Sequence, residues 1–200
     1  MLLSSKTRIT LEKPRGRIDV LLSWGKIAQK LRVPLGTALG LIFLILMHPS
    51  LRSLCIGGVV ALIGAALRVW AAGHIDKGKS LTQSGPYALT RNPLYLGSFL
   101  MAIGILAAGQ GYWLLLPFGV FFLGVYYPVM KAEEAELLQG YGQDFISYAR
   151  RVPFFFPSLR RAPAGAGSAF RWTRVFRNRE HQTVAGLLAA ATILLLKMLR

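Results

Sequence analysis

Residues 92–130 read NPLYLGSFLMAIGILAAGQGYWLLLPFGVFFLGVYYPVM and contain no Lys, Arg, Asp or Glu. The run is too long for a single membrane helix, because ~20 apolar residues already cross a hydrocarbon core of ~30 Å. The sequence Gly-Gln-Gly at 109–111 interrupts it near the middle, where glycine favours a turn. The stretch therefore predicts a tight helical hairpin in a membrane, with arms at 94–108 and 112–130.

Other apolar runs lie on both sides of this hairpin. Residues 33–51 carry no charge, residues 53–75 are rich in Gly and Ala, and each run is long enough for one span. In the second arm of the hairpin, Pro117 and Pro128 should kink the helix or end turns. The last run, 182–196, is short but can span if the basic residues after it extend to the interface. We therefore predict an all-α polytopic membrane protein with about five transmembrane helices.

The segment before the first span has apolar residues at helical spacing. Within residues 17–32, one face of a helix would carry Val20, Trp24, Ile27 and Leu31. Such a segment is typical of an amphipathic helix lying in the membrane interface. A helix that packs against the rest of the protein explains the pattern equally well.

Charge gives the expected orientation. The 200 residues include 24 Lys plus Arg and 8 Asp plus Glu, a net charge of +16. Basic residues that flank membrane spans explain this balance without a nucleic-acid partner. With the N-terminus in the cytoplasm, 21 of the 24 basic residues fall on the cytoplasmic side, as the positive-inside rule requires. We expect the lipid bilayer as the main partner; the oligomeric state stays open.

These patterns divide the chain into three predicted parts. Residues 1–32 form a basic arm with the interfacial helix, and residues 33–157 form a membrane core with four spans and a cytosolic helix. Residues 158–200 contain a linker, with the flexible sequence APAGAGS at 162–168, and the final transmembrane helix.

Polar residues that can carry chemistry gather at the cytoplasmic ends of the predicted spans. Arg68 is explained either by extension to the interface or, if it points into the bundle, by an anion that pairs with it. His74 reads most simply as a solvated interfacial side chain. Asn92 and Pro93 suit the start of a helix, but that role does not explain Tyr95.

Glu133 and Glu134 are neighbours and must point in different directions on a helix. On their own they read as a solvated helix surface beside Lys131 or Arg151. Three scattered histidines and one cysteine, Cys55, do not make a metal site, so no metal is expected.

Two ordered motifs resemble the superfamily of isoprenylcysteine carboxyl methyltransferases and phospholipid methyltransferases. The first has the pattern Gly-x-Tyr-x-x-x-Arg-His-Pro-x-Tyr-x-Gly and is read here as Gly85, Tyr87, Arg91, Asn92, Pro93, Tyr95 and Gly97. The second is read as Glu133, Glu134, Leu137, Tyr141, Gly142, Phe145, Tyr148, Val152, Pro153 and Pro157. The resemblance covers about half of the chain. One departure is Asn92, which stands where the family has His and cannot act as a base.

The resemblance implies an integral membrane enzyme of a bacterial inner membrane that uses S-adenosylmethionine (SAM) on a lipophilic or lipidated substrate. It implies cofactor-binding roles for His74, Tyr87, Arg91, Asn92, Pro93, Tyr95, Gly97, Glu133 and Glu134. Arg91, Glu133 and Glu134 are the implied catalytic residues. The candidates for substrate contact are Arg68, Trp70 and Tyr148.

The methylated atom stays open. A carboxylate is already ionised near pH 7 and needs only orientation by Arg91 or Arg68, whereas an amine needs Glu133 or Glu134 as a base. Two other functions remain: a nicotinamide-dependent membrane reductase on a related scaffold, and a non-enzymatic membrane protein that binds anionic lipid. Both leave the acidic pair unexplained.

Overall fold

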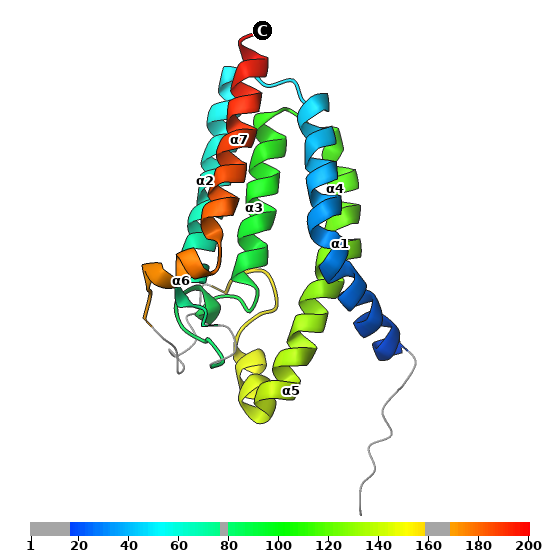
Figure 1. Ribbon diagram of the computed structural model, residues 1–200, viewed down its shortest axis with the longest axis vertical. Coiled ribbons are helices and arrows are strands. Elements are labelled where there is room, and N and C mark those ends of the chain that lie inside the picture. Colours follow the sequence, from blue (N-terminus) through cyan, green and yellow to red (C-terminus); the bar gives the residue numbers. More distant parts are fainter. Residues whose placement is uncertain (1–16, 77–79, 159–168) are drawn as a thin grey trace, which may run out of the picture.

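A computed structural model describes residues 17–76, 80–158 and 169–200, with side chains described from residue 23 onward. Within these ranges every regular element is helical (Figure 1). The long helices are α1 (Arg17–Leu46), α2 (Leu51–His74), α3 (Pro93–Ala108), α5 (Tyr127–Arg151) and α7 (Glu180–Met198). The short helices are η1 (Gly85–Ala88), η2 (Tyr112–Leu114), α4 (Leu115–Phe121), η3 (Phe122–Tyr126) and α6 (Trp172–Arg177). The predicted arm 1–16 and the linker 162–168 lie outside the described residues.

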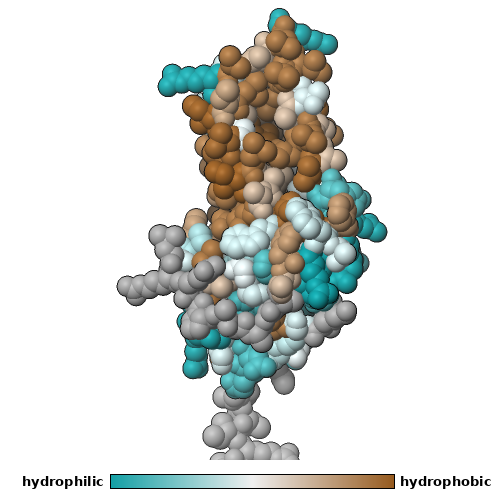
Figure 2. Space-filling view, turned by 90° about the vertical axis from the view of Figure 1, so that its left-hand side faces the viewer, coloured by the Kyte–Doolittle hydropathy of each residue, from teal (hydrophilic) through white to brown (hydrophobic). Residues whose placement is uncertain are grey.

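The predicted all-α polytopic membrane fold is confirmed. Among the described residues, four helical segments are long and apolar enough to cross a membrane: Ser23–Leu46, Leu51–His74, Tyr112–Arg151 and Glu180–Met198. The fifth predicted span corresponds to α3, which is apolar but has only 16 residues. Apolar side chains cover the upper body of the molecule and hydrophilic ones collect at its lower end (Figure 2). That lower end, here called the polar end, holds η1, α6 and the last turns of α5 (Figure 1).

Helix α1 differs from the sequence prediction. The predicted interfacial helix at 17–32 and the predicted span from residue 33 form one continuous helix of 30 residues, with Pro34 inside it. A proline within a membrane helix is tolerated because neighbouring groups satisfy the freed backbone carbonyl. Ala28 is fully buried against Val125 and Val129, so the first half of α1 also packs on the protein.

The hairpin predicted from the uncharged run is confirmed. Helix α3 ends at Gly109, and the turn is made by Gln110, whose φ is 54°, and Gly111, whose N–H donates to the Leu106 carbonyl at 2.8 Å. The second arm runs through η2 and α4 into η3, a π-helical segment of five residues. A π-helical segment marks a local irregularity in an α-helix, as the prolines of this arm suggested.

One of these prolines explains a contact between α1 and the second arm. Pro128 lacks the N–H that a regular α-helix would direct to the carbonyl of Gly124. The indole N–H of Trp24 donates to that carbonyl at 3.0 Å. A Cβ on Gly25 would lie 3.0 Å from the Pro128 carbonyl oxygen, so α1 approaches α5 closely here.

At the end of the molecule opposite the polar end, Lys197 links α7 to α1. Its ammonium group donates to the carbonyls of Leu44, Ile45 and Met47 at 2.9, 2.7 and 2.6 Å. These carbonyls belong to the last turn of α1 and the residue just after it, where the helix has no internal donors left. Lys197 thus ties α7 to α1, rather than only extending to the interface as the sequence predicted.

Helices α2 and α3 pack with almost no side chain between them. A Cβ on Gly57 would lie 2.2 Å from the Ala108 nitrogen, and one on Gly104 would lie 2.4 Å from the Ala61 nitrogen. The small-residue spacing predicted close helix packing, and the structure places it at this contact. Because α2 ends with His74 and α3 begins just after Asn92, this contact also fixes the start of the candidate site.

Replacing Gly57 by Ala should lower the free energy of unfolding by ~1–3 kcal/mol, because backbone atoms block the new methyl group. Gly58 is the matched control: a Cβ there meets nothing within 4 Å, so Gly58→Ala should leave stability unchanged or raise it slightly. Reversible unfolding in mixed detergent micelles measures both. Equal effects of the two substitutions would contradict the assigned contact.

Candidate functional site

The site begins where the chain passes from α2 to α3. Gly85 adopts φ +60°, and a Cβ there would lie 2.6 Å from Nε2 of His74. Glycine is therefore required both by the backbone conformation and by the ring beneath it. The short helix η1 that follows buries Tyr87 and leads to Arg91 at the start of α3.

The Pro-Phe-Phe-Phe-Pro segment closes over the start of α3. The backbone N–H of Arg91 donates to Pro153 and that of Ser158 donates to Leu89, both at 2.9 Å. The Thr90 hydroxyl donates to the Phe155 carbonyl at 2.8 Å. Residues 153–158, here called the strap, are therefore hydrogen-bonded to residues 89–92.

The side chain of Asn92 bonds to the strap and does not cap α3. Asn92 is the N-cap residue of α3, as predicted, but its side chain makes no capping hydrogen bond. Its amide nitrogen instead donates to the carbonyl of Phe154 at 3.0 Å. Pro93 occupies the first turn of α3, as predicted. The family His is thus replaced by a residue whose amide group holds the second motif against the first.

The acidic pair points in two directions, as expected from adjacent helical positions. Glu134 Oε1 lies 2.8 Å from Arg91 Nε, and its other oxygen accepts from Lys131 at 3.1 Å. Arg91 also donates from Nη1 to the Ala149 carbonyl at 2.8 Å. Glu134 and Arg91 are nearly buried and paired with each other, so this pair joins the two motifs.

Glu133 faces a cavity instead. Its Oε1 accepts from the Tyr95 hydroxyl at 2.7 Å, and that hydroxyl accepts from Arg32 Nη1 at 2.5 Å. The Arg32 nitrogen is itself 3.6 Å from the carboxylate. Arg32 comes from α1, and nothing in the two motifs predicted its part in the site.

A cavity of about 710 Å³ at the polar end, here called the polar chamber, collects most of these groups. Its charged lining residues are Arg32, Arg68, Arg91, Asp76, Glu133, Glu136 and Glu180. Four of the eight acids of the chain therefore line one cavity, against three arginines. Three of these acids are paired with arginines: Glu133 with Arg32, Glu180 with Arg68, and Asp76 with Arg174 and Arg177. The lining is therefore close to balanced in charge, although the whole chain carries a net charge of +16.

Tyr87 contributes an unsatisfied polar group to this chamber. The residue is 7% exposed, and its hydroxyl has no hydrogen-bond partner among the described residues. Its backbone is held by the Tyr148 hydroxyl, which donates to the Tyr87 carbonyl at 2.8 Å. Burial, with a smaller contribution from Tyr148, raises the pKa of the Tyr87 phenol, so it stays a neutral donor. A buried hydroxyl without a partner is unfavourable, and a ligand in the chamber would satisfy it.

Arg68 points into the bundle, and its partner comes from the last helix. Its Nε and Nη2 donate to the two carboxylate oxygens of Glu180 at 3.0 and 2.8 Å. The interpretation that Arg68 extends to the interface is therefore wrong, and Glu180 is the anion that a buried arginine requires. Glu180 is a charged residue at the start of the apolar helix α7, and this placement was the only hint in the sequence of its role.

Several predicted site residues lie outside the chamber. Trp70 is 38% exposed on the surface of α2, and its carbonyl lies 2.9 Å from Nδ1 of His74. The imidazole ring of His74 packs against Gly85, and its centroid lies 5.8 Å from the ring centroid of Phe170. Gly97 makes room for α2: a Cβ there would lie 2.6 Å from Cγ of Arg68. Asn92, Pro93 and Glu134 also shape the site without lining the chamber.

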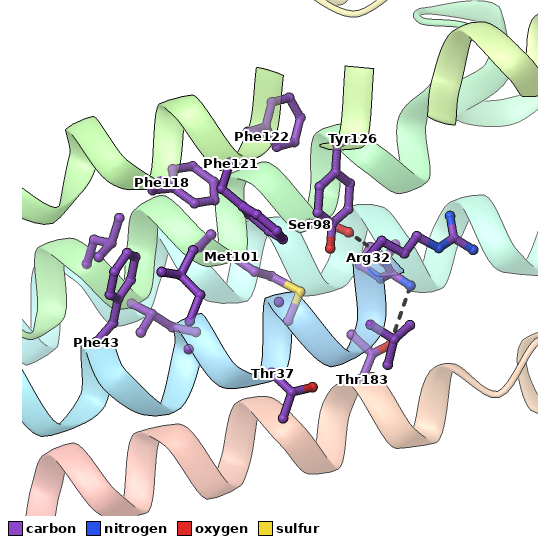
Figure 3. A pocket seen from close by; sticks show the side chains of 18 of the residues that line it. Arg32, Thr37, Phe43, Ser98, Met101, Phe118, Phe121, Phe122, Tyr126 and Thr183 are labelled. Atoms are coloured by element: carbon purple, nitrogen blue, oxygen red, sulfur yellow. Dashed lines mark hydrogen bonds between the residues drawn. The ribbon is translucent and has the colours of Figure 1, made fainter. Parts of the chain in front are cut away.

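A second cavity, of about 450 Å³, runs into the apolar body and is here called the apolar chamber (Figure 3). Polar side chains stand at one end, among them Ser98 and Thr183, whereas Phe43 and Phe118 stand toward the other (Figure 3). Residues that line both chambers are Arg32, Val33, Arg68, Ser98 and Tyr126. The two chambers therefore meet at a junction that carries two guanidinium groups.

Comparison with known proteins finds a matching family model and several relatives. The family model of phospholipid methyltransferases matches residues 54–144. The cobalt-zinc-cadmium resistance protein CzcN of Cupriavidus metallidurans is 35% identical over 116 residues, 56% of this chain and 52% of that protein. The nickel-cobalt-cadmium resistance protein NccN of Alcaligenes xylosoxydans xylosoxydans is 34% identical over 106 residues, 52% of this chain and 48% of that protein.

The chain thus spans about half the length of these two relatives. A third relative, the protein-S-isoprenylcysteine O-methyltransferase of Schizosaccharomyces pombe, is 27% identical over 153 residues, 72% of this chain and 64% of that protein. No solved structure matches the chain. The matched residues contain the whole first motif and the second motif from Glu133 to Gly142, where the helix is kinked and φ is +50°. Over these residues the chain is similar to the superfamily of integral membrane methyltransferases.

Proposed function

We propose that this protein is a SAM-dependent methyltransferase that acts on a lipophilic acceptor at the cytosolic face of a bacterial inner membrane. The observation that carries the proposal is the meeting of the two chambers at one junction. A polar cofactor fits the first chamber, a hydrocarbon tail fits the second, and the reacting group would lie between them. The orientation rests on the distribution of basic residues, which gather at the polar end.

The polar chamber suits SAM by its chemistry. Its charged lining residues are four acids and three arginines, so the chamber has no excess of positive charge that would repel the sulfonium. Glu133 can accept hydrogen bonds from hydroxyl or amino groups of a ligand. The Tyr87 hydroxyl supplies a donor that has no other described partner. Arg32 and Tyr95 hold the Glu133 carboxylate in place, so this acceptor is fixed before a ligand arrives.

When bound, SAM supplies a methyl group on sulfur whose transfer is an in-line displacement, for which positioning is the main requirement. The residues of this chain contribute rigidity: the strap and the Arg91–Glu134 pair fix one wall of the polar chamber. The apolar chamber orients the acceptor by burying its tail. Arg68 lacks the free face that the sequence assigned to a carboxylate substrate, because Glu180 already pairs with it, whereas Arg91 pairs with Glu134 and still lines the polar chamber.

Binding of S-adenosylhomocysteine tests the polar chamber. Wild-type protein should bind it measurably in calorimetry, and Glu133→Gln should weaken binding by ~10-fold or more through loss of a charged acceptor. Asp144→Asn is the control, because Asp144 is exposed and outside the chamber. The absence of binding heat up to millimolar concentration would contradict the proposal, and binding of NADPH instead would favour a reductase.

Tyr87→Phe separates ligand binding from stability. The substitution should weaken S-adenosylhomocysteine binding by ~3–10-fold, the value of one hydrogen bond. It should not lower the melting temperature of the ligand-free protein, because the removed hydroxyl has no described partner there. Calorimetry and thermal unfolding of one preparation give both results. Unchanged affinity would remove Tyr87 from the binding site.

The apolar chamber is tested by filling it. Gly40 lines the chamber, and a Cβ there meets nothing within 4 Å, so Gly40→Phe places a ring in the open space. Photocrosslinking in nanodiscs with hexadecanol carrying a terminal diazirine should label wild-type α4, and this labelling should fall at least ~10-fold in the variant. Gly119→Phe, at an equally open glycine outside the chamber, is the control. Equal labelling in Gly40→Phe would contradict tail binding here.

A further inference from the structure

The ion pair between Arg68 and Glu180 occupies the junction of the two chambers. Arg68 lines both cavities, whereas Glu180 lines the polar chamber and Thr183, one turn further along α7, lines the apolar one. The Glu180 side chain is 5% exposed and that of Arg68 is 20% exposed. An acceptor whose tail fills the apolar chamber must therefore bring its head group against this pair.

All five N–H donors of the Arg68 guanidinium are engaged. Nε and Nη2 donate to Glu180, and Nη2 also lies 3.4 Å from the Thr183 hydroxyl. Nη1 donates to the Leu94 carbonyl at 3.3 Å and to the Ser98 hydroxyl. A guanidinium has five donors and no acceptor, so none is left for a ligand. An anionic head group can bind Arg68 only by displacing Glu180.

Displacement of Glu180 is unfavourable, because it would leave a carboxylate buried without its counter-charge. The same holds for a cationic head group, which would have to draw Glu180 away from Arg68. The Arg68–Glu180 pair thus offers no open charge to a head group of either sign, although each residue alone would attract one of them. An uncharged polar head group meets neither penalty.

The backbone just before Glu180 has an unusual conformation that sets the position of this residue. Arg179, the residue before it, adopts φ 58°, in the left-handed region that is unfavourable for residues with a Cβ. This turn starts α7 so that its first carboxylate meets Arg68. A buried ion pair is often no more stabilising than apolar residues of similar size, so stability alone is a weak reason for placing one here.

We propose that the Arg68–Glu180 pair determines acceptor specificity by excluding head groups with a net charge from the junction. The proposal rests on the proposed function for the assignment of the acceptor tail to the apolar chamber. It adds α7, which lies beyond the residues matched by the family model, to the site. The substrate class that follows is a single-tailed or lipidated molecule whose reacting group is uncharged when it reaches the junction.

The test uses three photoreactive probes in nanodiscs: hexadecyl chains with a terminal diazirine and an alcohol, carboxylate or ammonium head. Wild-type protein should be labelled most strongly by the alcohol. Glu180→Gln, which frees the Arg68 donors, should raise carboxylate labelling relative to the alcohol by ~10-fold or more. Arg68→Met, which leaves Glu180 without a partner, should raise ammonium labelling relative to the alcohol by a similar factor.

Glu180→Asp and Thr192→Val are the controls. The first keeps the charge, and the second changes an exposed residue of α7 that lines neither chamber, so both should keep the wild-type order of head groups. If Arg68→Met does not fold, the comparison of Glu180→Gln with Glu180→Asp still decides the matter. The same head-group order in wild type and Glu180→Gln would overturn the proposal.

S-adenosylhomocysteine calorimetry on the same preparations keeps the two proposals apart. A changed head-group order without nucleoside binding would support the role of the pair and contradict the methyltransferase. Nucleoside binding with an unchanged head-group order would support the methyltransferase and contradict the role of the pair.

Discussion

The ion pair between Arg91 and Glu134 is the contact on which the candidate site depends. It joins the start of α3 to the helix that leaves the hairpin, 43 positions later in the sequence, at an Nε–Oε1 distance of 2.8 Å. Both side chains are about 15% exposed, and removing one partner of such a pair generally costs about 3–5 kcal/mol. The pair fixes α5 so that the neighbouring Glu133 faces the polar chamber. The strap adds backbone hydrogen bonds on the same side, so the two motifs form one rigid wall.

The division into a polar and an apolar chamber follows from the membrane fold. Helices α2 and α3 approach through glycine, which leaves no room for a cavity between them. The space instead lies where α1 faces α3 and α4, and small residues of α1, Gly36 and Gly40, line it. Arg32 stands where this space meets the polar end. A polar ligand and an apolar tail can therefore meet at one point without either entering an unfavourable medium.

Much of the fold was predictable because membrane spans have a strong local signal. The uncharged run at 92–130 could only be accommodated as a hairpin, and Gly109 marked its turn. The first half of α1 was harder, because an amphipathic pattern with Trp24 and Leu31 fits an interfacial helix and a packed helix equally well. Its continuity through Pro34 depends on neighbouring helices that local sequence does not describe.

The site was predictable only where the two motifs supply it. Arg91, Tyr95 and the acidic pair come together as the resemblance implied. Arg32 and Glu180 lie far from both motifs in sequence, and their roles arise from tertiary packing alone. Asn92 shows a third case: its position suited a helix cap, but the nearby carbonyl of the strap competes for its amide. A local preference was thus overridden by a long-range hydrogen bond.

The central claim is that a nucleoside cofactor lies in the polar chamber beside Glu133, directly below the apolar chamber. An experimental structure of the protein in nanodiscs with S-adenosylhomocysteine tests it most directly. The account predicts adenosyl density within hydrogen-bonding distance of Glu133 and Tyr87, with the sulfur toward the junction at Arg68. Density elsewhere, or Arg91 and Glu134 separated on opposite sides of the membrane, would contradict it.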